Sequence, residues 1–226
     1  MCWNLESSLI GAFVSTLTAM FLISRNEKVY KIYGWSLLGI TSMQWAESFL
    51  WGFGEVGSGT CTEFNRFGTR VLVPLAVYFQ PMGPFMACYK YGSSKGLKSI
   101  GKYYASFCSL YTFLPLMDFL MSDGLNLWAK VTCTVKTDMG YLYWGAPATL
   151  MPLIVWWVLV ATPIFLTFKA FKSLPLTLYG LLALVAAYLW TDSVGSNWCF
   201  HIVGYSAVGL LDYYFSKTPQ KSLKCA

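Results

Sequence analysis

The chain has 226 residues, of which 56% are hydrophobic and only 12% are charged. This balance departs from that of soluble proteins in the direction of membrane proteins. The length leaves no room for a separate soluble domain beside the seven apolar stretches described below. The formal net charge of +6 does not indicate nucleic-acid binding, because the basic residues gather in a few short gaps where anionic lipid headgroups attract them.

Seven apolar stretches follow one another, each close to the ~20 residues that a helix needs to cross a bilayer. They cover residues 8–24, 32–54, 70–90, 102–122, 146–168, 174–192 and 197–216. The sequence therefore predicts an all-α, seven-transmembrane-helix bundle that forms a single domain, residues 1–226. No basic segment precedes the first stretch, so we expect that stretch to insert as an uncleaved anchor.

Basic residues fall mainly in every second gap between these stretches. Those gaps and the C-terminal tail hold Arg25, Lys28, Lys31, Lys90, Lys95, Lys98, Lys102, Lys169, Lys172, Lys217, Lys221 and Lys224. Only Arg66, Arg70, Lys130 and Lys136 fall in the other gaps. The positive-inside rule then predicts an integral, multi-pass protein with its N-terminus outside and its C-terminus inside.

Two of the predicted helices have unusual composition. The first has small residues at Ser8, Gly11, Ser15 and Thr18, a stripe that lets helices approach closely in lipid. The third contains two prolines and a glycine in residues 80–84, which predicts a break in its hydrogen bonds near the middle of the membrane. Broken helices at this depth are typical of transport sites, and a plain proline kink is the structural alternative.

The predicted outer loops contain cysteines and one strand-like segment. Cys61 and Cys133 lie in the two longest outer loops, where an oxidising exterior allows a disulfide between them. Cys2 and Cys199 form a less favoured second pair, or are small buried residues. Residues 129–136 alternate apolar and polar side chains, which predicts a short β-strand in the loop between the fourth and fifth helices.

Ionisable residues inside a membrane are costly, and they are therefore candidates for function. The predicted topology places four of them in the outer half: Glu47, Asp118, Asp192 and His201. Together with polar or helix-breaking neighbours they predict a transport or binding site lined by Gln44, Glu47, Gln80, Pro81, Asp118, Asp192 and His201. Structural roles are the alternative: a hydrogen bond between helices for Glu47, and contact with headgroup water for Asp192 and His201.

Several chemistries are disfavoured by the sequence. The last stretch has no lysine for a retinal Schiff base, and the single histidine cannot build a multi-histidine metal site. Sequence motifs of common hydrolases and nucleotide-binding enzymes are missing, and a Ser–His–Asp triad at residues 192–201 would have nothing to orient it. We therefore expect no enzymatic activity, no cofactor and no bound metal.

Three short phrases carry a resemblance: Met1-Cys2-Trp3-Asn4, Met43-Gln44-Trp45-Ala46-Glu47 leading to Trp51, and Gly195-Ser196-Asn197-Trp198-Cys199. Together they resemble an uncharacterised family of small multi-pass membrane proteins from large DNA viruses of algae and protists. The resemblance implies a viral or protist source and a host-cell or viral membrane, and it implies no activity. The helix count is also similar to that of PQ-loop sugar transporters, as an architectural analogy only.

These observations favour a transporter or channel for a small cation, a proton or a polar solute, working through an outward-facing polar cavity around Glu47. The alternative is a non-enzymatic seven-helix receptor or viral envelope scaffold whose disulfide-tied outer loops bind a partner. The bilayer is the expected surrounding in both cases, no nucleic acid is expected as a partner, and a homo-oligomer is compatible with either.

Overall fold

The computed structural model describes residues 4–92, 94–111, 132–138, 140–144 and 194–217, together with residues 117, 120, 158, 160, 182 and 185; the side chains of 108–111, 194–201, 216 and 217 lie outside this description. The chain is mostly helical. The described elements are α1 (Leu5–Ile23), α2 (Lys28–Phe53), α3 (Glu63–Phe67), the π-helical turn η1 (Gly68–Leu72), α4 (Val73–Tyr91), α5 (Lys95–Tyr111), β1 (Val135–Lys136), β2 (Leu142–Tyr143) and α9 (Val194–Lys217).

Helix α1 begins at a side-chain cap, because the Asn4 carboxamide oxygen accepts a hydrogen bond of 2.8 Å from the backbone N–H of Ser7. The predicted stripe of small residues forms its buried face, together with Ala12, Ala19 and Leu22. The opposite face is apolar and exposed, with Ile10 at 62% and Leu17 at 64%. Small residues therefore face the bundle, and large apolar residues face outward, as expected of a helix in lipid.

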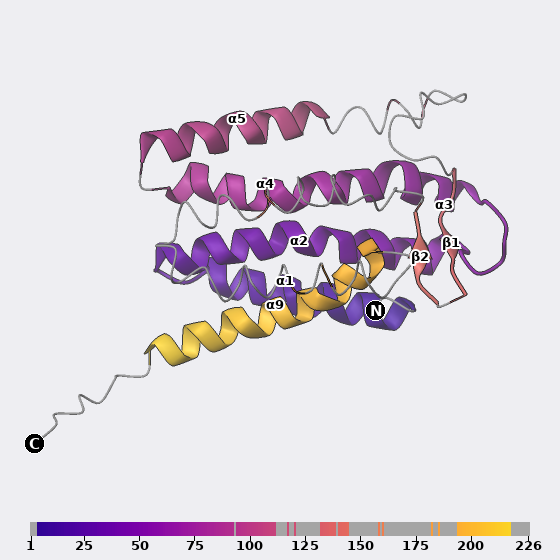
Figure 1. Cartoon of the computed structure of the whole chain (residues 1–226), viewed down its shortest axis with the longest axis horizontal. Helices are drawn as coiled ribbons and strands as arrows, with labels where there is room; N and C mark the ends of the chain where they lie inside the picture. The colour runs from indigo at the N-terminus through magenta and orange to yellow at the C-terminus, as the bar shows by residue number, and fades with distance from the viewer. Residues whose placement is uncertain are drawn as a thin grey trace, which may run out of the picture.

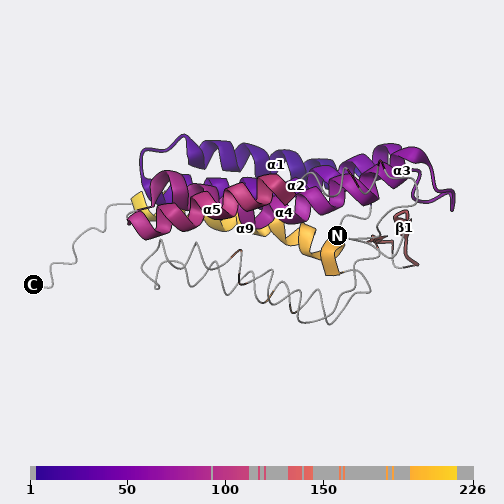
Figure 2. The same ribbon diagram turned by 90° about the horizontal axis from the view of Figure 1, so that it is seen from above.

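Helix α2 lies at the centre of the bundle and packs against α1, α4 and α9 (Figures 1 and 2). Two of its glycines permit close approach of neighbouring backbones. A Cβ added at Gly34 would lie 2.6 Å from the carbonyl oxygen of Ala19 in α1. A Cβ added at Gly39 would lie 2.6 Å from the carbonyl oxygen of Phe79 in α4. Both contacts hold only because the residue in α2 has no side chain.

Of the two interpretations of residues 80–84, an interrupted helix is not found, because α4 continues as an α-helix through both Pro81 and Pro84. Proline at position 84 cannot donate to the carbonyl of Gln80, and the α2 backbone at Gly39 packs directly against that carbonyl. The lost hydrogen bond thus falls where α4 packs against a neighbouring helix, a setting in which such a loss is tolerated. The departure from α-helical geometry lies earlier, at η1.

Helices α5 and α9 complete the described bundle from opposite sides. Helix α5 packs on α4, where Gly101 lies against the α4 backbone and Tyr104 stacks on Phe85 at 4.0 Å between ring centroids. Helix α9 packs on α1 and α2. The Tyr33 hydroxyl of α2 donates to the carbonyl of Tyr205 in α9, which fixes the register of the two helices.

The two ends of the bundle differ in structure, as Figure 1 shows, and their sequences differ in charge. One end carries α3 and a hairpin in which β1 and β2 pair antiparallel, with Val135 opposite Tyr143. The strand predicted in this loop is therefore present, as the two residues of β1. The other end carries the connections between α1 and α2 and between α4 and α5, together with the basic residues at positions 25–31 and 90–102. We call these the hairpin end and the basic end.

Two helices of the described chain are long and apolar enough to cross a membrane: Leu5–Ile23, and the continuous run Glu63–Tyr91 that contains α3, η1 and α4. Helix α2, with 26 residues, would extend about 39 Å and is long enough as well. Several polar residues in its interior make α2 less apolar than the other two helices. The stretches predicted at 146–168 and 174–192 fall almost entirely outside the described residues.

Candidate functional site

Glu47 lies in the last third of α2, toward the hairpin end, and its side chain is 0% exposed. On the same helix, Met43 and Leu50 flank it one turn below and one turn above, and both belong to an apolar cluster. Ile40, two turns below on nearly the same face, packs with Ile202 and Tyr205 of α9. The carboxyl group thus lies in the interior of the bundle, on a face of α2 that combines these apolar residues with the buried Gln44.

Gln44 and Ser8 share this level of the bundle with Glu47. A Cβ added at Gly11 of α1 would lie 3.3 Å from Oε1 of Gln44, so the amide rests directly on the α1 backbone. Leu5 of α1 approaches Gly52 of α2, which places Ser8 level with Glu47 between these two contacts. Ser8 is 0% exposed, and its hydroxyl has no hydrogen-bond partner among the described residues. We call Ser8, Gln44 and Glu47 the polar layer.

Gln80 is not part of the polar layer. It is buried in α4, and its carbonyl oxygen lies against Gly39 of α2. Gly39 precedes Glu47 by eight residues, so Gln80 lies about 12 Å lower along the bundle. Pro81, also buried, lies at the same lower level. Gln80 and Pro81 therefore lie at a different depth from Gln44 and Glu47.

Three further predicted site residues cannot be placed. Asp118 and Asp192 lie outside the described residues, and His201 belongs to α9 although its side chain is not described. Antiparallel packing of α9 on α2 places Ile202 beside Ile40, and the residues before Ile202 continue toward the hairpin end. No group of three or more His, Cys, Asp or Glu side chains gathers within the part of the chain that the structure describes.

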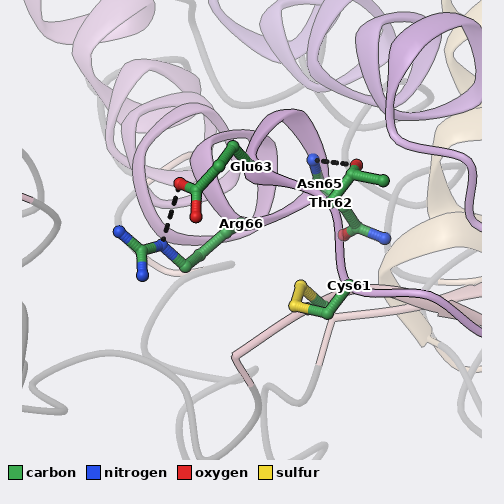
Figure 3. A network of polar contacts seen from close by, with 6 residues as sticks. Cys61, Thr62, Glu63, Asn65 and Arg66 are labelled. Atoms are coloured by element: carbon green, nitrogen blue, oxygen red, sulfur yellow. Dashed lines mark hydrogen bonds and ion pairs between the residues drawn. A yellow bond between two sulfur atoms is a disulfide. The ribbon is translucent and has the colours of Figure 1, made fainter.

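The predicted disulfide between Cys61 and Cys133 is present in the structure, with 5.7 Å between the two Cα atoms. Figure 3 shows it beside the first turn of α3, where the Thr62 hydroxyl accepts a hydrogen bond of 3.2 Å from the N–H of Asn65. An ion pair of 3.4 Å between Glu63 and Arg66 follows on the same turn. The bond joins the loop after α2 to the loop that leads into the hairpin.

A buried cluster of Asn65, Thr69 and Thr134 fixes the hairpin next to the disulfide. The Asn65 amide donates to the carbonyl of Thr134 at 2.9 Å, and its oxygen accepts from the N–H of Thr134 at 2.8 Å. The hydroxyls of Thr69 and Thr134 lie 2.7 Å apart. All three side chains are at most 1% exposed. We call these residues the hairpin clamp.

The hairpin covers part of the bundle end above the polar layer. Leu142 and Trp144 are buried, and they pack in one apolar cluster with Met43, Leu50 and Val73. The backbone N–H of Lys136 also donates to the carbonyl of Val56, in the loop after α2, at 3.2 Å.

Sequence reasoning missed two features of this region. It assigned Ser8 to helix packing alone, although its position in the small-residue stripe already places it opposite α2. It also missed the hairpin clamp, for which the signals are the i, i+4 spacing of Asn65 and Thr69 and the threonine after Cys133. No protein-family model matches the chain, and neither a curated protein nor a solved structure matches it.

Proposed function

We propose that the chain is a seven-helix membrane protein, with its N-terminus outside, that moves a small cation, a proton or a polar solute through the polar layer. Burial of Glu47 inside a bundle of membrane-length helices is the observation that carries the proposal. A carboxyl group in such a place is costly, and in membrane proteins it marks an ion or solute pathway by default.

The neighbours of Glu47 support a solute site more than a purely structural role. The Ser8 hydroxyl, at the same level, has no hydrogen-bond partner among the described residues, and a buried polar group of this kind calls for an explanation. A bound cation, water or polar solute would supply the partner. Hydroxyl and amide oxygens from Ser8 and Gln44, with the carboxylate of Glu47, are ligands that suit a hard cation or a hydrogen-bonding solute.

The direct test is flux into liposomes that contain the purified full-length chain. Glu47→Gln keeps the size of the side chain and removes its charge, and we expect it to lower flux by about tenfold or more. Glu55→Gln is the matched control, because Glu55 is exposed in the loop after α2. Flux of Glu47→Gln equal to that of the parent chain would exclude this pathway.

A receptor or envelope scaffold is the second candidate, and the hairpin clamp with its disulfide favours it. Two loops fixed by a covalent bond and by buried hydrogen bonds form a rigid outer surface, which suits partner binding. On this alternative no ion gradient drives flux in the liposome assay. Changes to exposed hairpin residues such as Val135 and Tyr143 abolish binding of the partner instead.

A further inference from the structure

Two lysines from different helices meet around one aromatic ring at the basic end. The Lys31 ammonium, from the first turn of α2, lies 5.7 Å from the centroid of the Tyr91 ring. The Lys90 ammonium, from the last turn of α4, lies 5.7 Å from the same centroid and 5.8 Å from the ring of Trp35. We call Lys31, Trp35, Lys90 and Tyr91 the lysine pair site.

Both ammonium groups of the site lie close to the same ring, that of Tyr91. Attraction between an ammonium and the face of a ring is modest at an exposed site, and it only partly offsets repulsion between the two lysines. Lys95 and Lys98 follow at once in the first turn of α5, and both are exposed. The site therefore gathers positive charge around the Tyr91 ring, and an anion bound beside the two lysines would stabilise it.

The surface next to this charge is apolar. Along α5, Ile100 is 49% exposed, Tyr103 is 74% exposed and Phe107 is 54% exposed. Their spacing of three and four residues places them on one face of the helix, leading away from Lys95 and Lys98 toward the middle of the bundle. A ligand that matches both parts carries a negative head and a long apolar tail.

We propose that the lysine pair site binds the headgroup phosphate of an anionic phospholipid, whose acyl chain lies along the exposed face of α5. Tyrosine and tryptophan at the level of the headgroups, beside lysine, are the side chains expected at such a boundary. Lysine binds phosphate as a point charge, so two ammonium groups from separate helices can approach different oxygens of one phosphate. The inference is independent of Glu47 and holds whether or not the chain conducts.

Native mass spectrometry of the full-length chain, titrated in detergent with phosphatidylglycerol, tests the proposal. The double variant Lys31→Gln/Lys90→Gln removes the two charges at the ring. The double variant Lys28→Gln/Lys102→Gln removes two exposed charges from the same end and has the same net charge. We expect the dissociation constant to rise by about tenfold in the first variant and by less than about twofold in the second.

Two further titrations distinguish binding of the whole lipid from binding of its charge or its phosphate alone. Phosphatidylcholine, with no net charge, should bind weakly to the parent chain, and glycerol 3-phosphate should not compete, because it has no tail. Equally weakened phosphatidylglycerol binding in both double variants would show that the basic end attracts the lipid diffusely, and would overturn a specific site at Lys31 and Lys90. Competition by glycerol 3-phosphate would show that phosphate alone is bound and would overturn the lipid.

A variant that keeps both charges tests the geometry. Tyr91→Leu removes the ring between the lysines, and we expect it to weaken phosphatidylglycerol binding severalfold, whereas Tyr91→Phe should bind as the parent does. Unchanged binding by Tyr91→Leu would contradict a built site. Circular dichroism on heating reports whether each variant folds, and Lys90→Gln alone replaces the double variant if that one does not.

Discussion

At the residue scale, the buried polar side chains of α2 follow two different rules. Ser36, Thr41 and Ser48 donate to the carbonyl oxygens four residues earlier, at 2.9, 2.7 and 2.7 Å. These hydroxyls are satisfied within their own helix and need no neighbour. An ionised carboxylate only accepts hydrogen bonds, so helix carbonyls cannot serve as partners of Glu47 in that form. Burial of Glu47 therefore depends on what other helices or a solute bring to it.

The hairpin clamp provides a residue-scale prediction. Thr134→Val keeps the shape of the side chain but removes the hydroxyl that lies 2.7 Å from the Thr69 hydroxyl. We expect the hairpin to detach more easily, by about 1 kcal/mol, because one buried hydrogen bond is lost while the Thr69 hydroxyl keeps its bonds to Asn65 and to the N–H of Thr134. Hydrogen exchange of the amides in residues 134–143 measures this opening.

Thr132→Val is the matched control, since Thr132 lies on the other side of Cys133 and is exposed. Its exchange rates in the hairpin should equal those of the parent chain. Faster exchange in Thr132→Val than in Thr134→Val would contradict the role of the clamp.

At the element scale, the crossing of α2 and α4 determines the shape of the bundle. Gly39 and Gly83 lie at the contact, where a Cβ on either residue would meet the Cα of the other at 3.1 Å. The Ser42 hydroxyl, one turn above Gly39, lies 3.0 Å from the carbonyl of Ala76 in α4. Close backbone packing and an interhelical hydrogen bond stabilise this contact. Helices in lipid associate mainly through such interactions, whereas helices in a soluble core associate through burial of apolar side chains.

Gly83→Ala is therefore expected to lower the free energy of unfolding by about 1–3 kcal/mol, because the added methyl group collides with the Trp35 carbonyl and the α2 backbone. Gly57→Ala adds the same group in the loop after α2, where nothing lies within 4 Å, and should be nearly neutral. Denaturant unfolding of the detergent-solubilised chain, followed by tryptophan fluorescence, compares the two. Equal stability of the two variants would contradict the close contact of α2 and α4 at Gly83.

Much of this fold follows from local pattern, and the rest depends on packing between distant residues. The spacing of Ser8, Gly11 and Ser15 predicted the buried face of α1, and the alternation around Val135 predicted a strand. The prolines alone did not predict a continuous α4, whose backbone at Gln80 packs against Gly39, more than 40 positions away in the sequence. The different depths of Gln80 and Glu47 depend in the same way on how α2 and α4 align, which no single segment records.

At the scale of the whole molecule, the chain is polarised from end to end. The basic end gathers lysines and Arg25, whose guanidinium lies 4.1 Å from the Phe21 ring and contacts the hydroxyl of Tyr213. The hairpin end carries the disulfide, the hairpin clamp and the exposed acids Glu55, Glu63 and Asp138. Such a division is what the positive-inside rule expects of a protein inserted in one orientation.

The proposed orientation can be tested by labelling single cysteines introduced at the two ends of α2. Gly57→Cys places a thiol at the hairpin end, and Asn26→Cys places one at the basic end; both positions are exposed. We expect a membrane-impermeant maleimide to label Gly57→Cys in intact cells, and Asn26→Cys only after permeabilisation, each relative to the parent chain. Labelling of both from the same side would contradict a spanning α2.

The bond between Cys61 and Cys133 also determines an order of events during synthesis. The two cysteines are 72 residues apart, and the chain between them includes α4 and α5. At about 5–20 residues per second, a ribosome needs roughly 4–14 s to make this interval. On the proposed orientation, Cys61 waits as a free thiol on the oxidising side during that time, open to oxidases and to wrong partners. On that orientation, closure of the bond reports that the segment carrying Cys133 has crossed the membrane.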